Sequence, residues 1–551
     1  MPEIKKICTI TGKEFSISEQ EQELRKKFGV ELPDIHPYER LRYLFSFENY
    51  YSLYARKCDL CQKDFVSVHD TDVDFPVYCM NCWYSDKWTP PQLDLDLDRS
   101  FFEQMEILSK TAPRLGQLAA DPMENSDYSN ACGSLKNCYM IFNANYCENC
   151  YYSVSINNDK DSIDLNLSDK NELSYECLLC NGCYQVFWSE FLENCRDCYF
   201  LYDCVDCHNC ALSTGLRHKA NIFLNEQLTK EEYDSKIKDL KSGNYQTVKK
   251  YKKQFEVLKK DYKKKFILGV KNEDVLGNMI YNSKKIENSF LVHDSESCVN
   301  SSNVRNAKDC LDIASFGVIS NESCYSCCAI GLQVMNLKFC TCCFSGAHDL
   351  EYCIQNISSH DCFGCIGGTK NEYKILNKQY SEEDYKATII KVKEKMQERG
   401  EYNQPQPQSL NPFAYNESIA NMIMPLTREE AEKLGYKWKE KKIPEVPQDK
   451  IYQPKDSISD ENWEDIKGKF VICEKSKRPF KIIEQEFNFY KKYNIPLPRI
   501  HPEVRMLDRY PSDLLFNLHD AKCSNCQENL QTSMPESDEV LCEKCYQEAV
   551  Y

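Results

Sequence analysis

Cysteine pairs near both ends of the chain are the residues whose type and spacing most clearly indicate chemistry. Near the start, Cys58 and Cys61 are followed by Cys79 and Cys82. Each Cys-x-x-Cys pair places two thiolates on one tight turn, and zinc takes four such ligands in a tetrahedron. Four thiolates leave no open position for water, so we expect the metal to stabilise a fold and not to catalyse a reaction.

The same pattern returns near the end of the chain and predicts a second structural zinc site. Its four cysteines are Cys523, Cys526, Cys542 and Cys545. The match extends to a His-Pro pair and an arginine, because His501 and Arg505 correspond to His36 and Arg40. We therefore interpret residues 1–90 as a zinc-ribbon module and residues 466–551 as its repeat.

Each module also contains a weaker pair of possible metal ligands. These are a cysteine and a histidine: Cys8 with His36, and Cys473 with His501. Thr11 and Ser476 stand where a second cysteine of each pair is expected. Glu39 could add an oxygen ligand in the first module, whereas Val504 could not in the second. Two ligands rarely hold zinc, so a buried thiol beside a packed histidine is the preferred interpretation and a weak metal site is the alternative.

Between the modules, cysteines recur at a spacing of twelve residues. Cys183, Cys195 and Cys207 form one series, and Cys298 and Cys310 belong to another. A fixed period predicts a repeat architecture, and twelve residues suit a thin β-solenoid with two short faces per turn. Cysteine is small enough to fill its interior, and an aromatic residue after it would point to the opposite face.

The predicted fold that positions these residues is mostly β with helical caps. Two cysteine-rich β-solenoid (β-helix-like) blocks are expected at 126–220 and 271–370. The remaining segments are a connector at 91–125, a cap with a basic amphipathic helix at 221–270, a helical cap at 371–400 and a proline-rich linker with one helix at 401–465. Thr229 and Ser381 are suitable N-caps for the two cap helices.

The thiols of the two blocks admit three interpretations. Filling of a buried interior is preferred, and further zinc or iron–sulfur sites or a disulfide ladder are the alternatives. The 33 cysteines are an odd number, the start of the chain lacks the apolar region of a secretory signal, and no apolar run is long enough to span a membrane. We therefore expect a cytoplasmic protein with reduced thiols.

A lysine-rich helix over residues 241–265 is the one candidate surface for anions. The possible anion-binding residues are Lys249, Lys250, Lys252, Lys253, Lys259, Lys260, Lys263, Lys264 and Lys265. With aromatic residues between them, they could bind nucleic acid together with the two zinc ribbons. The net charge of −16 opposes this, so packing of the helix on its own acidic protein is preferred.

The composition favours a binding protein over an enzyme. Asp159, Asp161 and Asp164 interrupt the first block, and aligned carboxylates on a solenoid could act on a polysaccharide, but no acid–base pair can be identified. A metal or redox store is a further alternative. The leading hypothesis is a non-catalytic, zinc-stabilised scaffold whose ribbons and solenoid faces recognise a macromolecular partner, most readily a protein. Its oligomeric state cannot be derived from the sequence.

Several motifs together resemble a family of uncharacterised, cysteine-rich repeat proteins found mostly in bacterial genomes. They are RKCDLCQKDF and VYCMNCWYSDKW in the first module, KNCYMIFNANYCENCYYS and KILNKQYSEEDY in the repeats, and FYKKYNIPLPRIHPEVR in the last module. The resemblance implies zinc-ribbon-like terminal modules and implies no activity. Such proteins carry further cysteines where this chain has Thr11, Ser476, Glu39 and Val504, which weakens a second zinc site in each module.

Overall fold

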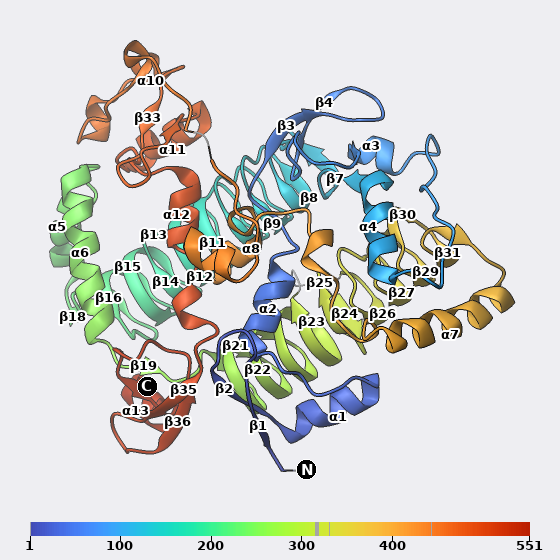
Figure 1. Cartoon of the computed structure of the whole chain (residues 1–551). Helices are drawn as coiled ribbons and strands as arrows, with labels where there is room; N and C mark the ends of the chain where they lie inside the picture. The colour runs from blue at the N-terminus through green and yellow to red at the C-terminus, as the bar shows by residue number, and fades with distance from the viewer. Residues whose placement is uncertain (1, 315–318, 330, 442, 551) are drawn as a thin grey trace.

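The computed structural model describes residues 2–314, 319–329, 331–441 and 443–550 and is rich in strands (Figure 1). Two long ladders of mainly parallel strands occupy the middle of the chain. The terminal modules and the segment after the second ladder pack around them. Within the described residues, no helix has the length and hydropathy needed to cross a bilayer.

The first ladder runs in chain order. Its strands are β7 (Ala119–Glu124), β8 (Asn130–Lys136), β9 (Phe142–Asn145), β10 (Val154–Asn157), β11 (Ile163–Asp169), β12 (Tyr175–Asn181), β13 (Tyr184–Phe187), β14 (Glu190–Glu193), β15 (Arg196–Val205), β16 (His208–Thr214), β17 (Ala220–Phe223) and β18 (Glu226–Gln227). From β8 to β17 the pairing is parallel with a constant offset of twelve residues, as in Val154 with Asn166. The sequence period is therefore the strand register.

The second ladder repeats this arrangement less regularly. Its strands are β20 (Gly269–Val270), β21 (Glu273–Tyr281), β22 (Lys284–His293), β23 (Glu296–Ala314), β24 (Ile319–Glu322), β25 (Tyr325–Cys328), β26 (Val334–Lys338), β27 (His348–Glu351), β28 (Ile354–Ile357), β29 (His360–Phe363), β30 (Ile366–Thr369), β31 (Glu372–Ile375) and β32 (Lys378–Gln379). The offset is twelve between Ile286 and Cys298 but fourteen between Arg305 and Ile319.

Backbone corners divide each twelve-residue repeat into four short sides. Positive φ recurs at every third residue, for example at Asn194, Asp197 and Phe200. The residue after most corners of the first ladder points inward, and Cys195 and Cys198 are at most 1% exposed. The predicted two faces per repeat are therefore wrong, because a corner every three residues produces four. The cysteine spacing of three within a repeat was the signal for this geometry.

Contacts between successive repeats offset the cost of these corners. A left-handed residue costs about 1–2 kcal/mol. At Trp188 the corner N–H donates to Tyr175 O of the preceding repeat at 2.9 Å. At other corners amide side chains stack, so that Asn137 donates to Asn149 and Asn149 to Asp161. The corners are thus held by pairing along the ladder and not by local sequence alone.

The inward positions form a narrow interior in which thiols and hydroxyls are interchangeable. All twelve cysteines of the first ladder occupy inward positions and are buried. The Cys198 thiol donates to Arg196 O at 3.1 Å, and the Ser189 hydroxyl donates to Phe187 O at 2.9 Å. In the second ladder, Cys328 and Cys342 do not follow this inward pattern.

Replacing an interior thiol tests this packing. We expect Cys198→Ser to cost less than about 1.5 kcal/mol, because serine makes the same hydrogen bond two residues back. Cys198→Leu adds methylene groups to a filled interior and should cost about 1–3 kcal/mol. Urea unfolding of both variants measures the difference. Equal unfolding midpoints would show that the interior has spare room.

The two terminal modules share one order of elements. The N-terminal module contains β1 (Ile4–Ile7), β2 (Glu14–Ile17), α1 (Glu19–Phe28), α2 (Pro37–Phe45), β3 (Tyr54–Lys57), β4 (Asp64–Ser67), β5 (Val77–Tyr78) and α3 (Met80–Trp83). The C-terminal module contains β33 (Val471–Ile472), β34 (Pro479–Phe480), α11 (Glu484–Tyr493), α12 (Pro502–Asp508), β35 (His519–Lys522), β36 (Asn529–Thr532), β37 (Val540–Leu541) and α13 (Glu543–Val550).

The helices that pack against the ladders are α4 (Phe101–Thr111), α5 (Lys230–Leu240), α6 (Tyr245–Asp261) and α7 (Glu382–Glu398). The shorter helices that follow the second ladder are α8 (Ile419–Ile423), α9 (Arg428–Lys433) and α10 (Trp463–Ile466). Thr229 caps α5 in a capping box with Glu232, and Ser381 caps α7. The lysine-rich helix ends at Asp261, earlier than predicted. Lys264 and Lys265 instead form strand β19 (Lys264–Lys265), which pairs with β37.

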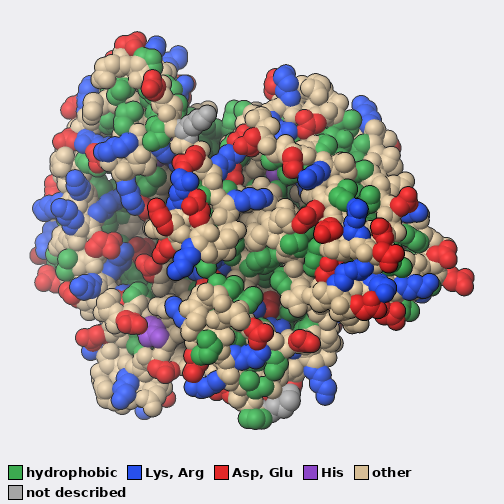
Figure 2. All heavy atoms as spheres, in the orientation of Figure 1, with side chains coloured by type: hydrophobic (Ala, Val, Ile, Leu, Met, Phe, Trp, Pro, Cys, Tyr) green, Lys and Arg blue, Asp and Glu red, His purple; other side chains and the backbone are tan. Residues whose placement is uncertain are grey.

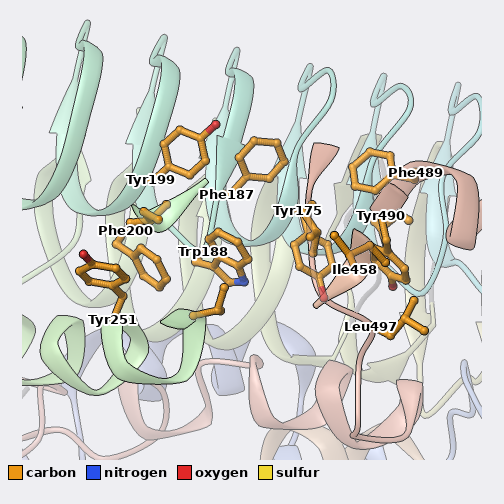
Figure 3. Packing of buried hydrophobic residues seen from close by; sticks show 14 of the residues in the cluster. Tyr175, Phe187, Trp188, Tyr199, Phe200, Tyr251, Ile458, Phe489, Tyr490 and Leu497 are labelled. Carbon is orange, nitrogen blue, oxygen red and sulfur yellow. The ribbon is translucent and has the colours of Figure 1, made fainter. Parts of the chain in front are cut away.

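Outward side chains of the first ladder form aromatic columns at the twelve-residue period. Tyr175, Phe187 and Tyr199 form one column, and Trp188 stacks on Phe200 at 5.0 Å in the next (Figure 3). Helix α6 and the C-terminal module pack against these columns. The aromatic residues after the cysteines thus point outward, as expected, and build the core between the ladder and its cover.

Candidate metal centres

The N-terminal metal centre is built from a hairpin turn and the start of a helix. Cys58 and Cys61 lie in the turn between β3 and β4, Cys79 caps α3 and Cys82 lies within it. All four sulfur atoms lie within 4.8 Å of one another. This group could hold a metal ion in a closed four-sulfur site.

Backbone groups of the turn favour a thiolate at Cys61, whereas burial raises the pKa of Cys79 and Cys82. The Lys63 N–H lowers the pKa of Cys61 to about 7. Cys79 N donates to Cys58 Sγ at 3.3 Å. Such N–H donors stabilise the negative sulfur that a metal requires.

The C-terminal metal centre repeats this geometry. Cys523 and Cys526 lie between β35 and β36, and Cys542 and Cys545 lie at the start of α13, again with all sulfurs within 4.8 Å. Burial would raise the pKa of Cys523, but backbone N–H groups, including that of Cys542, lower it to about 6. Within the described ranges, no other group of three or more possible ligands comes this close together.

Each metal centre is joined to the entrance of one ladder by strand pairing. Strand β5 pairs with β6 (Arg114–Leu115), which precedes the first ladder. Strand β37 pairs with β19, which precedes the second ladder. The C-terminal junction is reinforced by Asp203, which accepts hydrogen bonds from Tyr262 and Tyr546 and forms an ion pair with Arg217. The centres therefore fix the positions of the ladder ends.

The cysteine and histidine of each weaker ligand pair form hydrogen bonds that stabilise the fold. His36 Nδ1 accepts a hydrogen bond from Tyr38 N and so caps α2, while Cys8 Sγ accepts one from His36 N. His501 caps α12 in the same way. Burial lowers the pKa of each histidine to about 4. Cys473 Sγ accepts a hydrogen bond from Ser476 N at 3.3 Å.

Glu39, the possible oxygen ligand, forms an ion pair with Arg42. These contacts agree with the preferred interpretation of a buried thiol beside a packed histidine.

The three aspartates of the first block lie in different environments. Asp159 points inward, accepts hydrogen bonds from Asn171 and has a pKa raised by burial to about 7. Asp161 belongs to an amide stack at the corners. Asp164 forms ion pairs with Arg505 at 2.9 Å and Arg509 at 3.0 Å. They do not form the paired carboxylates that hydrolysis of a polysaccharide needs.

The predicted anion-binding lysines divide into two groups. Five form ion pairs with carboxylates of the same chain: Lys252, Lys259, Lys263, Lys264 and Lys265. The other four, Lys249, Lys250, Lys253 and Lys260, are exposed on α6. Figure 2 shows blue side chains with red ones between them along the edge where α5 and α6 lie. This mixed surface is a weak attractor for phosphate.

Sequence reasoning did not find how the modules dock on the ladders. Arg25 and Arg40 of the N-terminal module share Asp312 of the second ladder, at 3.2 and 3.0 Å. Arg505, the counterpart of Arg40, binds Asp164 of the first ladder. The occurrence of an arginine at the same place in both modules, Arg40 and Arg505, could have indicated this shared docking contact. Each module thus contacts both ladders. Its arginines form ion pairs with one ladder, and the strand beside its metal centre pairs with the strand that precedes the other ladder.

Comparison with known protein-family models and with curated proteins found no match to this chain. The resemblance to cysteine-rich repeat proteins therefore rests on the motifs alone.

Proposed function

We propose that this protein is a zinc-stabilised scaffold without catalytic activity, in which two cysteine-rich β-solenoids present rigid surfaces to a protein partner. One observation carries the proposal: each four-cysteine group lies in a module that pairs strand to strand with a ladder entrance. A metal held there would lock both ladders in place. Four sulfur ligands favour zinc, and they leave no position for a substrate.

The ladder surfaces suit recognition of a large partner. Corner side chains repeat at regular intervals along a stiff axis, as in other repeat proteins with extended binding faces. Tyr146 on the first ladder is 68% exposed and Met335 on the second is 47% exposed. Both positions report on these surfaces.

The test uses the full-length, metal-loaded chain with a photo-crosslinking residue at Tyr146 or Met335. We expect a defined partner to crosslink and, once purified, to bind the metal-loaded chain at least about tenfold more tightly than a Cys82→Ser/Cys545→Ser variant. Equal binding by both forms would refute a metal-stabilised scaffold. Turnover of a substrate by the purified chain would refute the absence of catalysis.

Nucleic-acid binding is the alternative that the exposed lysines of α6 support. Its mark would be a gel shift that weakens steeply with salt and disappears when Lys249, Lys250, Lys253 and Lys260 become glutamine. We expect no such shift at about 150 mM salt, because the remaining lysines are already paired with carboxylates.

A further inference from the structure

A cavity of about 80 Å³ lies apart from the metal centres, where several parts of the chain meet. Its walls come from residues 47–50 and 68–69 of the N-terminal module, 114–115, 118 and 130–131 at the first ladder, 329, 341–344 and 354–357 of the second ladder and 410–413 of the linker. An engineered cavity of about 150 Å³ holds benzene, so this volume suits a molecule of about three to five non-hydrogen atoms.

Two buried polar side chains line the cavity and make no hydrogen bond of ordinary length. They are Glu48, which is 3% exposed, and His69, which is 2% exposed. Both carboxyl oxygens of Glu48 and both ring nitrogens of His69 lack such a bond. The hydrogen-bonding groups near them are Tyr50 for Glu48 and the Leu115 backbone for His69. Other polar groups in the wall are used: the Asn130 amide donates to Asn49 O, and Gln355 accepts from Leu115 N. Unpaired buried groups are costly and indicate a missing partner.

The position of His69 is fixed by aromatic packing. Its ring stacks on Phe413 with centroids 5.1 Å apart and an interplanar angle of 2°, and Phe75 meets it edge-on at 5.2 Å. Burial lowers the pKa of His69 to about 3, so the ring is neutral at pH 7 and offers one donor and one acceptor. Burial raises the pKa of Glu48 to about 8, partly offset by Tyr50, so its carboxyl is mostly protonated and can donate.

The cavity is also lined by a cation whose charge is only partly balanced. Arg114 is 2% exposed, and among the described residues Asp74 is near it but forms no ion pair with it. Its guanidinium donates to Ala112 O at 2.8 Å and to Ser109 Oγ at 2.9 Å and packs over Phe75. Burial lowers the pKa of Arg114 to about 10, and Asp74 compensates this only in part. A bound anion would supply the missing charge.

We propose that this cavity binds a short-chain carboxylate. Its carboxylate group would accept hydrogen bonds from Glu48 and His69 and balance the charge of Arg114. Its short aliphatic end would lie against apolar wall residues such as Phe47 and Leu115. Because the walls come from both ladders and the N-terminal module, the ligand would also strengthen their junction.

The experiment is a calorimetric titration of the full-length, metal-loaded chain with sodium propionate. Propionamide serves as the neutral isostere. We expect one propionate site per chain and at least about tenfold weaker binding of the amide. His69→Phe keeps the ring packing but removes both nitrogens, and we expect at least about a tenfold loss of affinity. Glu48→Gln keeps a donor of the same size and should retain binding within about threefold.

A crystal structure with propionate completes the test. Ligand density beside Glu48 and His69 would support the site. Density for ordered water alone, equal binding of acid and amide, or unchanged binding by His69→Phe would each overturn it. If His69→Phe loses bound metal and so reports misfolding, Glu48→Leu decides the question, and unchanged binding by that variant overturns the proposal.

Discussion

Chelation of the metal is expected to unfold both terminal modules and to free them from the ladder entrances. Structural zinc sites contribute on the order of 10–16 kcal/mol of apparent binding free energy, and this energy holds the modules folded. Elemental analysis should give two zinc ions per chain, one for each four-cysteine group. Trp83 and Trp88, which pack beside the N-terminal centre, should report the loss by fluorescence.

Single substitutions separate the two centres. Cys82→Ser and Cys545→Ser should each reduce the metal content from two ions to one, and the double variant should reduce it to none. Cys198→Ser, inside the first ladder, is the matched control and should keep both ions. With 33 cysteines and eight ligands, 25 thiols lie outside the two four-cysteine groups. More than about four metal ions per chain would instead indicate a metal store.

Removal of the Asp164 carboxylate is expected to give the second large effect. Asp164 is fully buried and forms ion pairs with Arg505 and Arg509. Asp164→Asn keeps the shape but removes the ion-pair partner of two guanidinium groups, to which Glu176 and Glu486 contribute only from a longer distance. Loss of one partner from a buried pair costs about 3–5 kcal/mol. We expect a lower urea midpoint and faster proteolysis of the C-terminal module.

An exposed ion pair provides the control for this effect. Lys5 and Glu14 lie 2.9 Å apart with side chains that are 67% and 58% exposed. Glu14→Gln should change stability by less than about 1 kcal/mol, because water screens such a pair. If Asp164→Asn behaves like this control, the docking of the module on the first ladder does not depend on the ion pairs.

Local sequence patterns were sufficient to predict the cysteine turns, the helix caps and the strand register. The paired cysteines at 58–61 and 523–526 each lie on one tight hairpin turn, so their chemistry could be derived without the rest of the fold. Thr229 and Ser381 cap helices because a cap depends on residues three positions apart. The period of twelve likewise gave the strand register.

The four-sided repeat was missed because bulky residues such as Trp188 and Phe200 adopt positive φ. A positive φ is rare for bulky residues in general, and here it is stabilised by hydrogen bonds to neighbouring repeats. The end of α6 at Asp261 was missed for a similar reason, since Lys264 and Lys265 pair with a strand more than 270 residues away.

The sequence by itself thus determined two four-cysteine groups, a twelve-residue ladder and the matching modules at either end, because each depends on neighbouring residues or on a simple period. Only the tertiary structure decided which ladder each module binds and that Glu48, His69 and Arg114 line one cavity. Asp164 and Arg505 are separated by 341 positions, and their attraction depends on burial that no local pattern records. Long-range electrostatics and packing, unlike turns and caps, exist only once the chain is folded.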